Sequence, residues 1–257
     1  MTEADRLNAI LEREAPLVAR CLTDLGRRAA LPRGIPVQSA QAANTRYNAT
    51  IGQVTDGRGN PLPLPELAGN LGGTVDPSTA FLYSPMAGHG ALRRAWADRQ
   101  RRLSGGSTVS TSLPVVTYGL TQSISHVSEL FADADTEVLV QDLHWGNYDL
   151  LFGLRNGARV STFRQFDDER RFSLADLEVQ LQARAGRKTI VVLNFPNNPT
   201  GYAPTQAESE QLADLLASQP GPLVVVCDDA YAGMFFEDGL MKRSLFWDLA
   251  EKADPER

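Results

Sequence analysis

The chain has 257 residues, of which 42% are hydrophobic and 22% are charged, an ordinary composition for a globular protein with a sizeable core. With a formal net charge of −6, the chain has no overall basic field that would attract nucleic acid or an anionic membrane. Two widely spaced cysteines, a polar N-terminus and the absence of any apolar run of roughly 18 residues predict a cytoplasmic protein with reduced thiols and no membrane span.

The first predicted element is a helix over residues 3–29, where apolar residues recur at helical spacing. Thr2 and Asp5 predict a capping box at its start. Pro16 predicts a kink or a restart as a second helix, because proline lacks an N–H and clashes with the preceding turn.

A long arm is predicted over residues 31–79, which are rich in Pro, Gly and Asn and have no clear periodicity. It is expected to contain a turn at residues 56–57 and a short strand near Ile51. An amphipathic helix is predicted next, over residues 88–104, and two glycines at 105–106 are expected to end it.

From residue 113 onward, β-branched runs alternate with segments of helical period. This pattern predicts an α/β fold, with a mostly parallel sheet that carries helices on both faces. The predicted strands are 113–118, 137–141, 158–163, 188–194 and 222–228, and the predicted helices between them are 120–133, 146–155, 173–184 and 205–218.

Distinctive side chains follow the predicted strands, at the sheet edge where ligands bind in such folds. A glycine that opens a helix offers free N–H groups to a phosphate, and an indole offers a stacking face to a flat ring. A carboxylate beside a ring nitrogen raises the pKa of that nitrogen and keeps it protonated. Together these groups predict pyridoxal 5′-phosphate (PLP), which stabilises carbanions. They are Gly119, Thr121, Trp145, Asn198, Asp228 and Tyr231.

Several segments, in the same order along the chain, resemble the class I/II aminotransferases, which are fold-type I PLP enzymes. The resemblance covers roughly residues 44–238. Its segments are T-I-G-Q-V-T-D-G-R-G-N-P-L (50–62), Y-S-P-M-A-G-H-G-A-L-R (83–93), V-T-Y-G-L-T-Q (116–122), L-H-W-G-N-Y (143–148), N-N-P-T-G (197–201) and D-D-A-Y (228–231).

The resemblance implies a cofactor-binding role for most of the residues that follow strands. Gly119, Leu120 and Thr121 would hold the phosphate. Trp145 would stack on the ring, and Asp228 would pair with the ring nitrogen.

Other residues acquire roles from the same resemblance. Asn198 and Tyr231 would donate hydrogen bonds to the ring oxygen. Tyr83 would reach the cofactor of a neighbouring subunit, which implies a homodimer, although a purely structural place for Tyr83 is also open. Ile51 and Gly52 would lie on the side of the substrates, an amino acid and a 2-oxo acid.

Each assignment has a structural alternative. Asn198 could cap its own turn, Trp145 could be ordinary core, and Thr121 could be an ordinary residue of a first helical turn. Asp229 competes with Asp228 for the role at the ring nitrogen.

Two departures from the family pattern stand out. Tyr148 occupies a place where the aspartate-type enzymes have a histidine behind the ring-pairing carboxylate, which points to another branch. The lysine that carries PLP as a Schiff base normally follows D-D-A-Y by a few tens of residues, and Lys242 and Lys252 are too near. We therefore expect this lysine beyond Arg257, no catalytic residue within the segment, and an inactive fragment of a larger enzyme.

The sequence thus predicts an N-terminal helix and arm, part of a small domain, over residues 1–60, and an incomplete PLP-binding large domain over residues 61–257. The predicted function is that of a PLP-dependent aminotransferase fragment. Another PLP enzyme, such as a β-lyase, decarboxylase or synthase, and a non-catalytic PLP-binding module remain alternatives. The histidines show no metal-ligand spacing, so no metal site is predicted.

Overall fold

The computed structural model describes the chain in two compact units, Met1–Pro85 and Met86–Arg257. Ile51, Gly52 and Tyr83 lie outside the described residues, as does the strand expected near Ile51. The division at residue 60 stays a prediction. The described residues are 2–16, 19, 24–28, 35–46, 48, 50, 56, 58, 65 and 85–253.

The N-terminal unit begins with helix α1 (Glu3–Glu14), followed by the short helix α3 (Asp24–Arg28). The predicted capping box is confirmed: the Thr2 hydroxyl accepts the Asp5 N–H at 3.1 Å, and the Asp5 carboxylate accepts the Thr2 N–H at 2.7 Å. The helix ends at Glu14, just before Ala15 and Pro16, because a proline makes helical geometry unfavourable for the residue that precedes it.

Helix α4 (Ile35–Ala42) lies in the predicted long arm, where no helix was expected, so that prediction was wrong here. Pro36 stands in its first turn, where the missing N–H has no intrahelical partner to lose. Gln and Ala, which favour helix, fill most of the rest.

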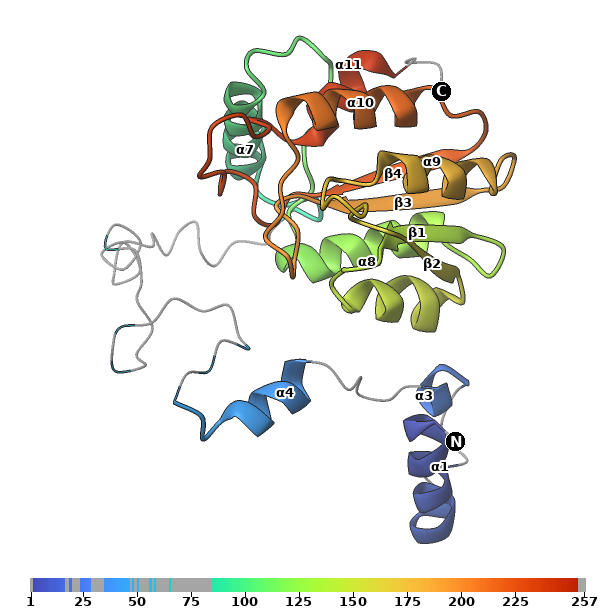
Figure 1. Ribbon diagram of the computed structural model, residues 1–257. Helices are drawn as coiled ribbons and strands as arrows, with labels where there is room; N and C mark the ends of the chain where they lie inside the picture. Colours follow the sequence, from blue (N-terminus) through green and yellow to red (C-terminus); the bar gives the residue numbers. More distant parts are fainter. Residues whose placement is uncertain are drawn as a thin grey trace. The chain divides into compact units, whose positions relative to one another are not determined.

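The second unit is built on a four-stranded parallel sheet in the order β2-β1-β3-β4, which confirms the predicted α/β fold (Figure 1). Each observed strand begins at the predicted residue or one residue later. The strands are β1 (Glu137–Gln141), β2 (Arg159–Phe163), β3 (Thr189–Asn194) and β4 (Leu223–Asp228).

Helices cover both faces of the sheet, as predicted. In Figure 1, α10 and α11 lie on one side of the strands and α8 lies on the other. The core clusters place α9, α10 and α11 on one face, and α8 and η1 on the opposite face. The elements are α7 (Gly90–Leu103), α8 (Gly119–Phe131), the π-helix η1 (Asp149–Arg155), α9 (Leu174–Gln182), α10 (Gln206–Ala217) and α11 (Leu245–Lys252).

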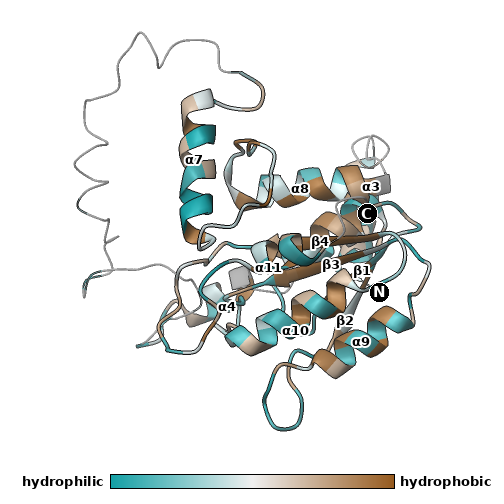
Figure 2. Ribbon diagram, turned by 90° about the horizontal axis from the view of Figure 1, so that it is seen from above, coloured by the Kyte–Doolittle hydropathy of each residue, from teal (hydrophilic) through white to brown (hydrophobic). Residues whose placement is uncertain are grey.

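Alternation along the central strands supplies both halves of the core. Val138 and Val140 of β1 join the cluster under α8 and η1, whereas Leu139 between them joins the cluster under α9, α10 and α11. Strand β3 divides its residues in the same way, with Ile190 on one face and Val191 on the other. The middle parts of β3 and β4 are accordingly coloured as hydrophobic in Figure 2.

The strand predicted at residues 113–118 is not present. Val116 donates its N–H to the Ala87 carbonyl at 3.1 Å, and the Arg93 side chain donates to the Pro114 carbonyl at 2.6 Å. No described strand pairs with this segment, and its proline has no N–H for a ladder. Strand pairing depends on a distant partner, which periodicity within the segment does not report.

The helices of this unit differ from the predictions in two places. The helix predicted over residues 146–155 is the shorter π-helix η1, and α11 was not predicted. The glycines at 105–106 both have positive φ, +74° and +88°, and end α7 as predicted. Within the described ranges, no helix combines the length and the apolar character needed to cross a membrane.

Substitution of Leu139 by alanine tests the two-faced core. Leu139 is fully buried in the central part of β1, so we expect Leu139→Ala to lower the free energy of unfolding by about 2–5 kcal/mol. Leu130→Ala on α8 is the matched control, because Leu130 is 76% exposed and its loss should cost about 0.5 kcal/mol or less. Urea unfolding followed by circular dichroism measures both, and equal losses would contradict this assignment of the core.

Candidate functional site

The loops that follow β1, β3 and β4 meet at the carboxyl edge of the sheet around a cleft of about 210 Å³. After β1 the chain enters η1 on one face, and after β3 it enters α10 on the other face, so the two loops diverge and leave a crevice. Six residues predicted to bind the cofactor line it, and the seventh, Gly119, directly precedes the lining residue Leu120 in α8. The lining residues are Leu120, Thr121, Trp145, Asn194, Asn198, Asp228, Ala230 and Tyr231.

One end of the cleft is the N-terminus of α8. Gly119 opens the helix with φ of +75°, a conformation that favours glycine, and no side chain of Tyr118 caps the helix. The N–H groups of Leu120 and Thr121 belong to the first turn, where the helix itself provides no acceptor. This end of the cleft is therefore suited to an anion.

The three asparagines at and just after the end of β3 differ in their hydrogen bonds. Asn194 is 2% exposed, and its Nδ2 donates to the Asp228 backbone carbonyl at 2.9 Å. Its Oδ1 accepts the Asn198 N–H at 2.6 Å. One buried amide therefore ties the end of β4 to the turn that carries Asn198, a link that the sequence alone did not reveal.

The side chain of Asn197 also makes hydrogen bonds within the protein. Its Nδ2 donates to the Leu143 carbonyl at 3.2 Å, and its Oδ1 accepts the Thr200 N–H at 3.1 Å and the Thr200 hydroxyl at 2.6 Å. The side-chain amide of Asn198 makes no hydrogen bond with any other described residue, although it lines the cleft. Self-capping by Asn198 is therefore not observed, and its amide is open to a ligand.

Trp145 and Tyr148 lie in one turn after β1. The Tyr148 N–H donates to the Trp145 carbonyl at 3.1 Å, and the two rings meet edge to face with their centroids 5.7 Å apart. The half-buried indole lines the cleft, while Tyr148 lies behind it in the core. Trp145 thus contributes to the core and also offers a surface in the cleft.

Asp228, at the end of β4, is the buried carboxylate of the cleft and is only 3% exposed. Its Oδ2 accepts the Tyr148 hydroxyl at 2.5 Å, and its Oδ1 accepts the Ala230 N–H at 3.1 Å. Burial raises the pKa of Asp228, and these two hydrogen bonds partly oppose the rise. Among the described residues no lysine, arginine or histidine forms an ion pair with Asp228, so a cation in the cleft would favour its charged form.

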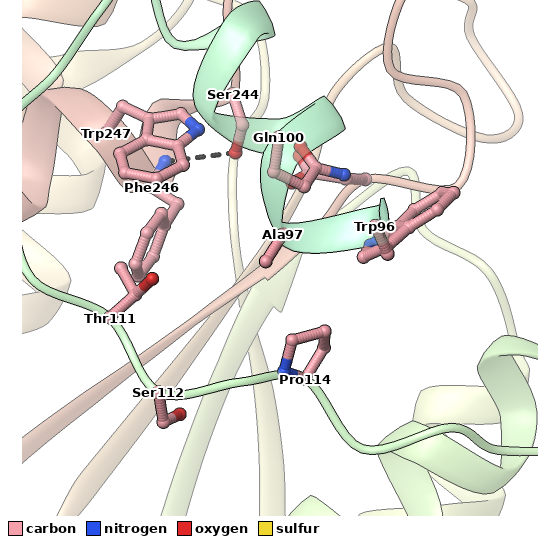
Figure 3. A pocket seen from close by; sticks show the side chains of 10 residues that line it. Trp96, Ala97, Gln100, Thr111, Ser112, Pro114, Ser244, Phe246 and Trp247 are labelled. Carbon is pink, nitrogen blue, oxygen red and sulfur yellow. Dashed lines mark hydrogen bonds between the residues drawn. The ribbon is translucent and has the colours of Figure 1, made fainter. Parts of the chain in front are cut away.

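Asp229 does not line this cleft. It lines a separate hollow of about 250 Å³ among α7, the segment before α8 and the start of α11, with Trp96, Ser244 and Phe246 in its wall (Figure 3). Burial raises the pKa of Asp229 to about 6, and a hydrogen bond with Ser244 opposes this. Of the two neighbouring carboxylates, Asp228 is the one that shares a cleft with Trp145.

Three more polar groups of the cleft have no hydrogen-bond partner among the described residues: the Thr121 hydroxyl, the Trp145 indole N–H and the Tyr231 hydroxyl. Tyr231 is 39% exposed, which is consistent with a side chain at the mouth of the cleft. Asn194 is the site residue that sequence reasoning missed, and its only sequence signal is its position at the end of β3. Tyr148, three residues after Trp145, was singled out in the sequence only as a departure from the family pattern.

Residues 48–254 match the family described as aminotransferase class I and II. A probable N-succinyldiaminopimelate aminotransferase of Mycobacterium tuberculosis is 27% identical over 180 residues, which are 66% of this chain and 44% of the relative. An aspartate/prephenate aminotransferase of Thermus thermophilus is 30% identical over 155 residues, 60% of this chain and 39% of the relative. The chain thus spans less than half the length of these curated relatives.

Solved structures agree on the fold. An aminotransferase from Anaerococcus prevotii superposes with a TM-score of 0.71 at 22% identity, over 89% of this chain and 58% of that one. The cytoplasmic aspartate aminotransferase of Saccharomyces cerevisiae gives a TM-score of 0.62 at 19% identity, over 93% and 57% of the two chains.

The raised pKa of Asp229 predicts a pH-dependent stability. Because the folded pKa of about 6 exceeds the ordinary 3.8, Asp229 contributes stability below about pH 4 that is lost as the pH rises through about 6. As the pH rises from about 4 to above 6, we expect the melting temperature of Asp229→Asn to rise relative to that of the wild type. Asp238→Asn, in an exposed loop, is the control, and its difference from the wild type should stay flat. A flat difference for Asp229→Asn as well would contradict the burial of Asp229.

Proposed function

Because the chain belongs to the class I and II aminotransferase family, we propose that it is part of a PLP-dependent aminotransferase. Its substrates would be an amino acid and a 2-oxo acid. The observation that carries the proposal is the convergence of six predicted cofactor-binding residues, from four separate segments of the chain, on one cleft.

The chemistry of the cleft supports PLP as the ligand. The uncapped first turn of α8 suits a phosphate, and the Trp145 indole suits a flat ring. Asp228 is a buried carboxylate without a cationic partner among the described residues, which suits a protonated ring nitrogen. The free amide of Asn198 and the free hydroxyl of Tyr231 suit the ring oxygen. The phosphate, the ring, the ring nitrogen and the ring oxygen of the cofactor thus each have a counterpart in the cleft.

When bound, PLP supplies an electron sink for a carbanion at the α-carbon of the substrate. Asp228, as the anion, holds the proton on the ring nitrogen, since an opposite charge nearby raises the pKa of that nitrogen. Asn198 and Tyr231 donate to the ring oxygen and orient the ring, and the N–H groups of Leu120 and Thr121 hold the phosphate. Trp145 excludes water from one face of the ring.

The remaining parts of the site belong to the proposal as well. We place the lysine that would carry PLP in the part of the parent enzyme that this chain does not span, as the coverage of 44% and 39% of the curated relatives allows. The parent would be a cytoplasmic homodimer, with Tyr83 reaching the cofactor of the second copy and with Ile51 and Gly52 beside the substrate. This chain alone would bind the cofactor without turnover.

Binding of pyridoxine 5′-phosphate tests the cleft in this chain. This analogue keeps the ring and the phosphate but has no aldehyde, so it cannot react with surface lysines. Asn198→Ala should weaken binding by roughly tenfold, as expected for the loss of one hydrogen bond, and Trp145→Ala by a similar factor. Equilibrium dialysis measures the dissociation constants.

The control is Phe246→Ala, which removes a partly exposed aromatic ring that lines the separate hollow and should leave binding unchanged. Equal effects of Phe246→Ala and Trp145→Ala, or no saturable binding by the wild type, would count against the cleft as the cofactor site.

The reaction itself is tested in the parent enzyme. Asp228→Ala should lower transamination by at least about a hundredfold, because the ring nitrogen loses the charge that keeps it protonated, while phosphate-anchored binding partly remains. The measurement is the transfer of the amino group from a panel of amino acids to a 2-oxo acid. Release of ammonia or carbon dioxide as the main product would favour a lyase or a decarboxylase. No turnover in the presence of PLP would favour a binding module.

A further inference from the structure

We propose that His144 is a positioning residue, which together with Asp149 fixes the turn that presents Trp145 to the cleft. The proposal rests on the proposed function, because the Trp145 indole is the surface offered there to the ring of the cofactor. The hydrogen bonds of His144 are nevertheless a property of the ligand-free chain, so they can be tested separately.

Both ring nitrogens of His144 have hydrogen-bond partners within one turn of the chain. Nδ1 lies 2.7 Å from the backbone carbonyl oxygen of Gln141, the last residue of β1. Nε2 lies 3.0 Å from Oδ2 of Asp149, the first residue of η1. The side chain therefore links the end of the strand to the start of the helix, across the turn that contains Trp145.

The two partners of His144 determine the protonation state in which it can bond to both. A backbone carbonyl and an ionised carboxylate are acceptors only, whereas a neutral imidazole has one donor and one acceptor. The ring can therefore make both hydrogen bonds at once only when both of its nitrogens carry a proton. His144 links the two ends of the turn as an imidazolium, and as a neutral ring it keeps only one of the two bonds.

The surroundings of His144 favour the charged ring. Its hydrogen bond with the Asp149 carboxylate raises the pKa of His144, and burial of the ring opposes that rise. The His144 side chain is 14% exposed, whereas that of Asp149 is 54% exposed, so water screens part of the attraction between the two charges. The other titratable groups near the ring are Asp142, two residues earlier, Tyr148, whose ring is stacked on it with the centroids 6.2 Å apart, and Asp228, which accepts the Tyr148 hydroxyl.

The hydrogen bonds of His144 act on Trp145 through the backbone. His144 directly precedes Trp145, and the Tyr148 N–H donates to the Trp145 carbonyl. The backbone is thus held on both sides of the indole, by the ring of His144 before it and by the N–H of Tyr148 after it. Loss of one bond of His144 weakens the first of these supports, so the indole becomes less ordered and has to be ordered again when a flat ring binds.

A purely structural role for His144 makes a different prediction. If the ring served only to fill space beside Tyr148, its replacement would lower stability and would change ligand binding by the same factor at every pH. If His144 positions Trp145, the support depends on the charge of the ring. Because the folded pKa of His144 lies above the ordinary 6.5, this support is present below about pH 6.5 and is lost as the pH rises through the folded pKa.

The first measurement is nitrogen-15 NMR of the ligand-free chain. The His144 ring resonances are identified by their absence from His144→Asn, and the Trp145 indole resonance by its absence from Trp145→Phe. We expect Asp149→Ala to lower the titration midpoint of His144 by about half a pH unit, the size expected for a partly exposed ion pair. The heteronuclear NOE of the Trp145 indole, which reports its order, should fall between pH 6 and pH 9 in the wild type and should be low at both pH values in Asp149→Ala.

The second measurement is the binding of pyridoxine 5′-phosphate at two pH values. His144→Asn keeps an N–H donor near the position of Nδ1 but loses the ring charge and the bond to Asp149. We expect it to raise the dissociation constant about threefold at pH 6 and to match the wild type at pH 9, where the neutral histidine has lost that bond as well. Ionisation of the ligand affects both proteins alike and cancels in the ratio of their constants.

His126→Asn is the matched control. His126 lies on the exposed surface of α8 with its Nδ1 3.8 Å from Glu129, so it is also a histidine beside a carboxylate, and its replacement should leave the dissociation constant unchanged at both pH values.

Three results would overturn the proposal: an equal ratio of dissociation constants at pH 6 and pH 9, an unchanged His144 midpoint in Asp149→Ala, or an indole NOE of the wild type that does not depend on pH. Should His144→Asn not fold, Asp149→Ala decides, because it keeps the histidine and changes only an exposed side chain.

The two measurements together separate this proposal from the proposed function. If the midpoint and the order of the indole respond as expected but the wild type binds no pyridoxine 5′-phosphate, His144 is confirmed as the residue that positions Trp145 while the assignment of the cofactor fails. If the ligand binds but the ratio is the same at both pH values, the cofactor site stands and the role of His144 fails.

Discussion

The parallel direction of the strands is the constraint on which the rest of the site depends. Because β1, β3 and β4 run the same way, the residues that follow them come to one edge of the sheet. The register pairs Asn194 directly with Asp228 at the ends of β3 and β4, which brings the asparagine amide within reach of the aspartate carbonyl. If the pairing register of β4 shifted by one residue, the side chains of β4 would turn to the other face of the sheet, and the cleft would be lost.

Core and site are built from the same residues here. The cluster under α8 and η1 contains the buried valines of β1 and also Tyr148, whose hydroxyl reaches Asp228. Trp145 packs against this cluster while it lines the cleft. Substitutions on this face of the sheet therefore bear on stability and on the cleft together, whereas the core cluster under α9, α10 and α11 contains none of the residues that line the cleft.

The sequence predicted what depends on local pattern. Strand β1 and the positions of Trp145, Asn198 and Asp228 follow from β-branched runs and from the rule that ligands gather where parallel strands end. The segment 113–118 has the same local pattern and forms no strand, because pairing requires a partner elsewhere in the chain. The bond from the Asn194 amide to the Asp228 carbonyl was likewise out of reach, since nothing local to either residue encodes a contact across 34 positions.

Two adjacent carboxylates at the end of β4 make this part of the fold less stable than an apolar core would be. Asp228 and Asp229 are adjacent and partly or fully buried, burial raises the pKa of both, and the charge of Asp228 raises that of Asp229 further. At neutral pH the fold therefore bears the cost of keeping charge away from water. A bound cation beside Asp228 would offset part of that cost, so ligand binding and folding stability are coupled through this carboxylate. That coupling gives a physical reason to keep a charged side chain where an apolar one would fold more easily.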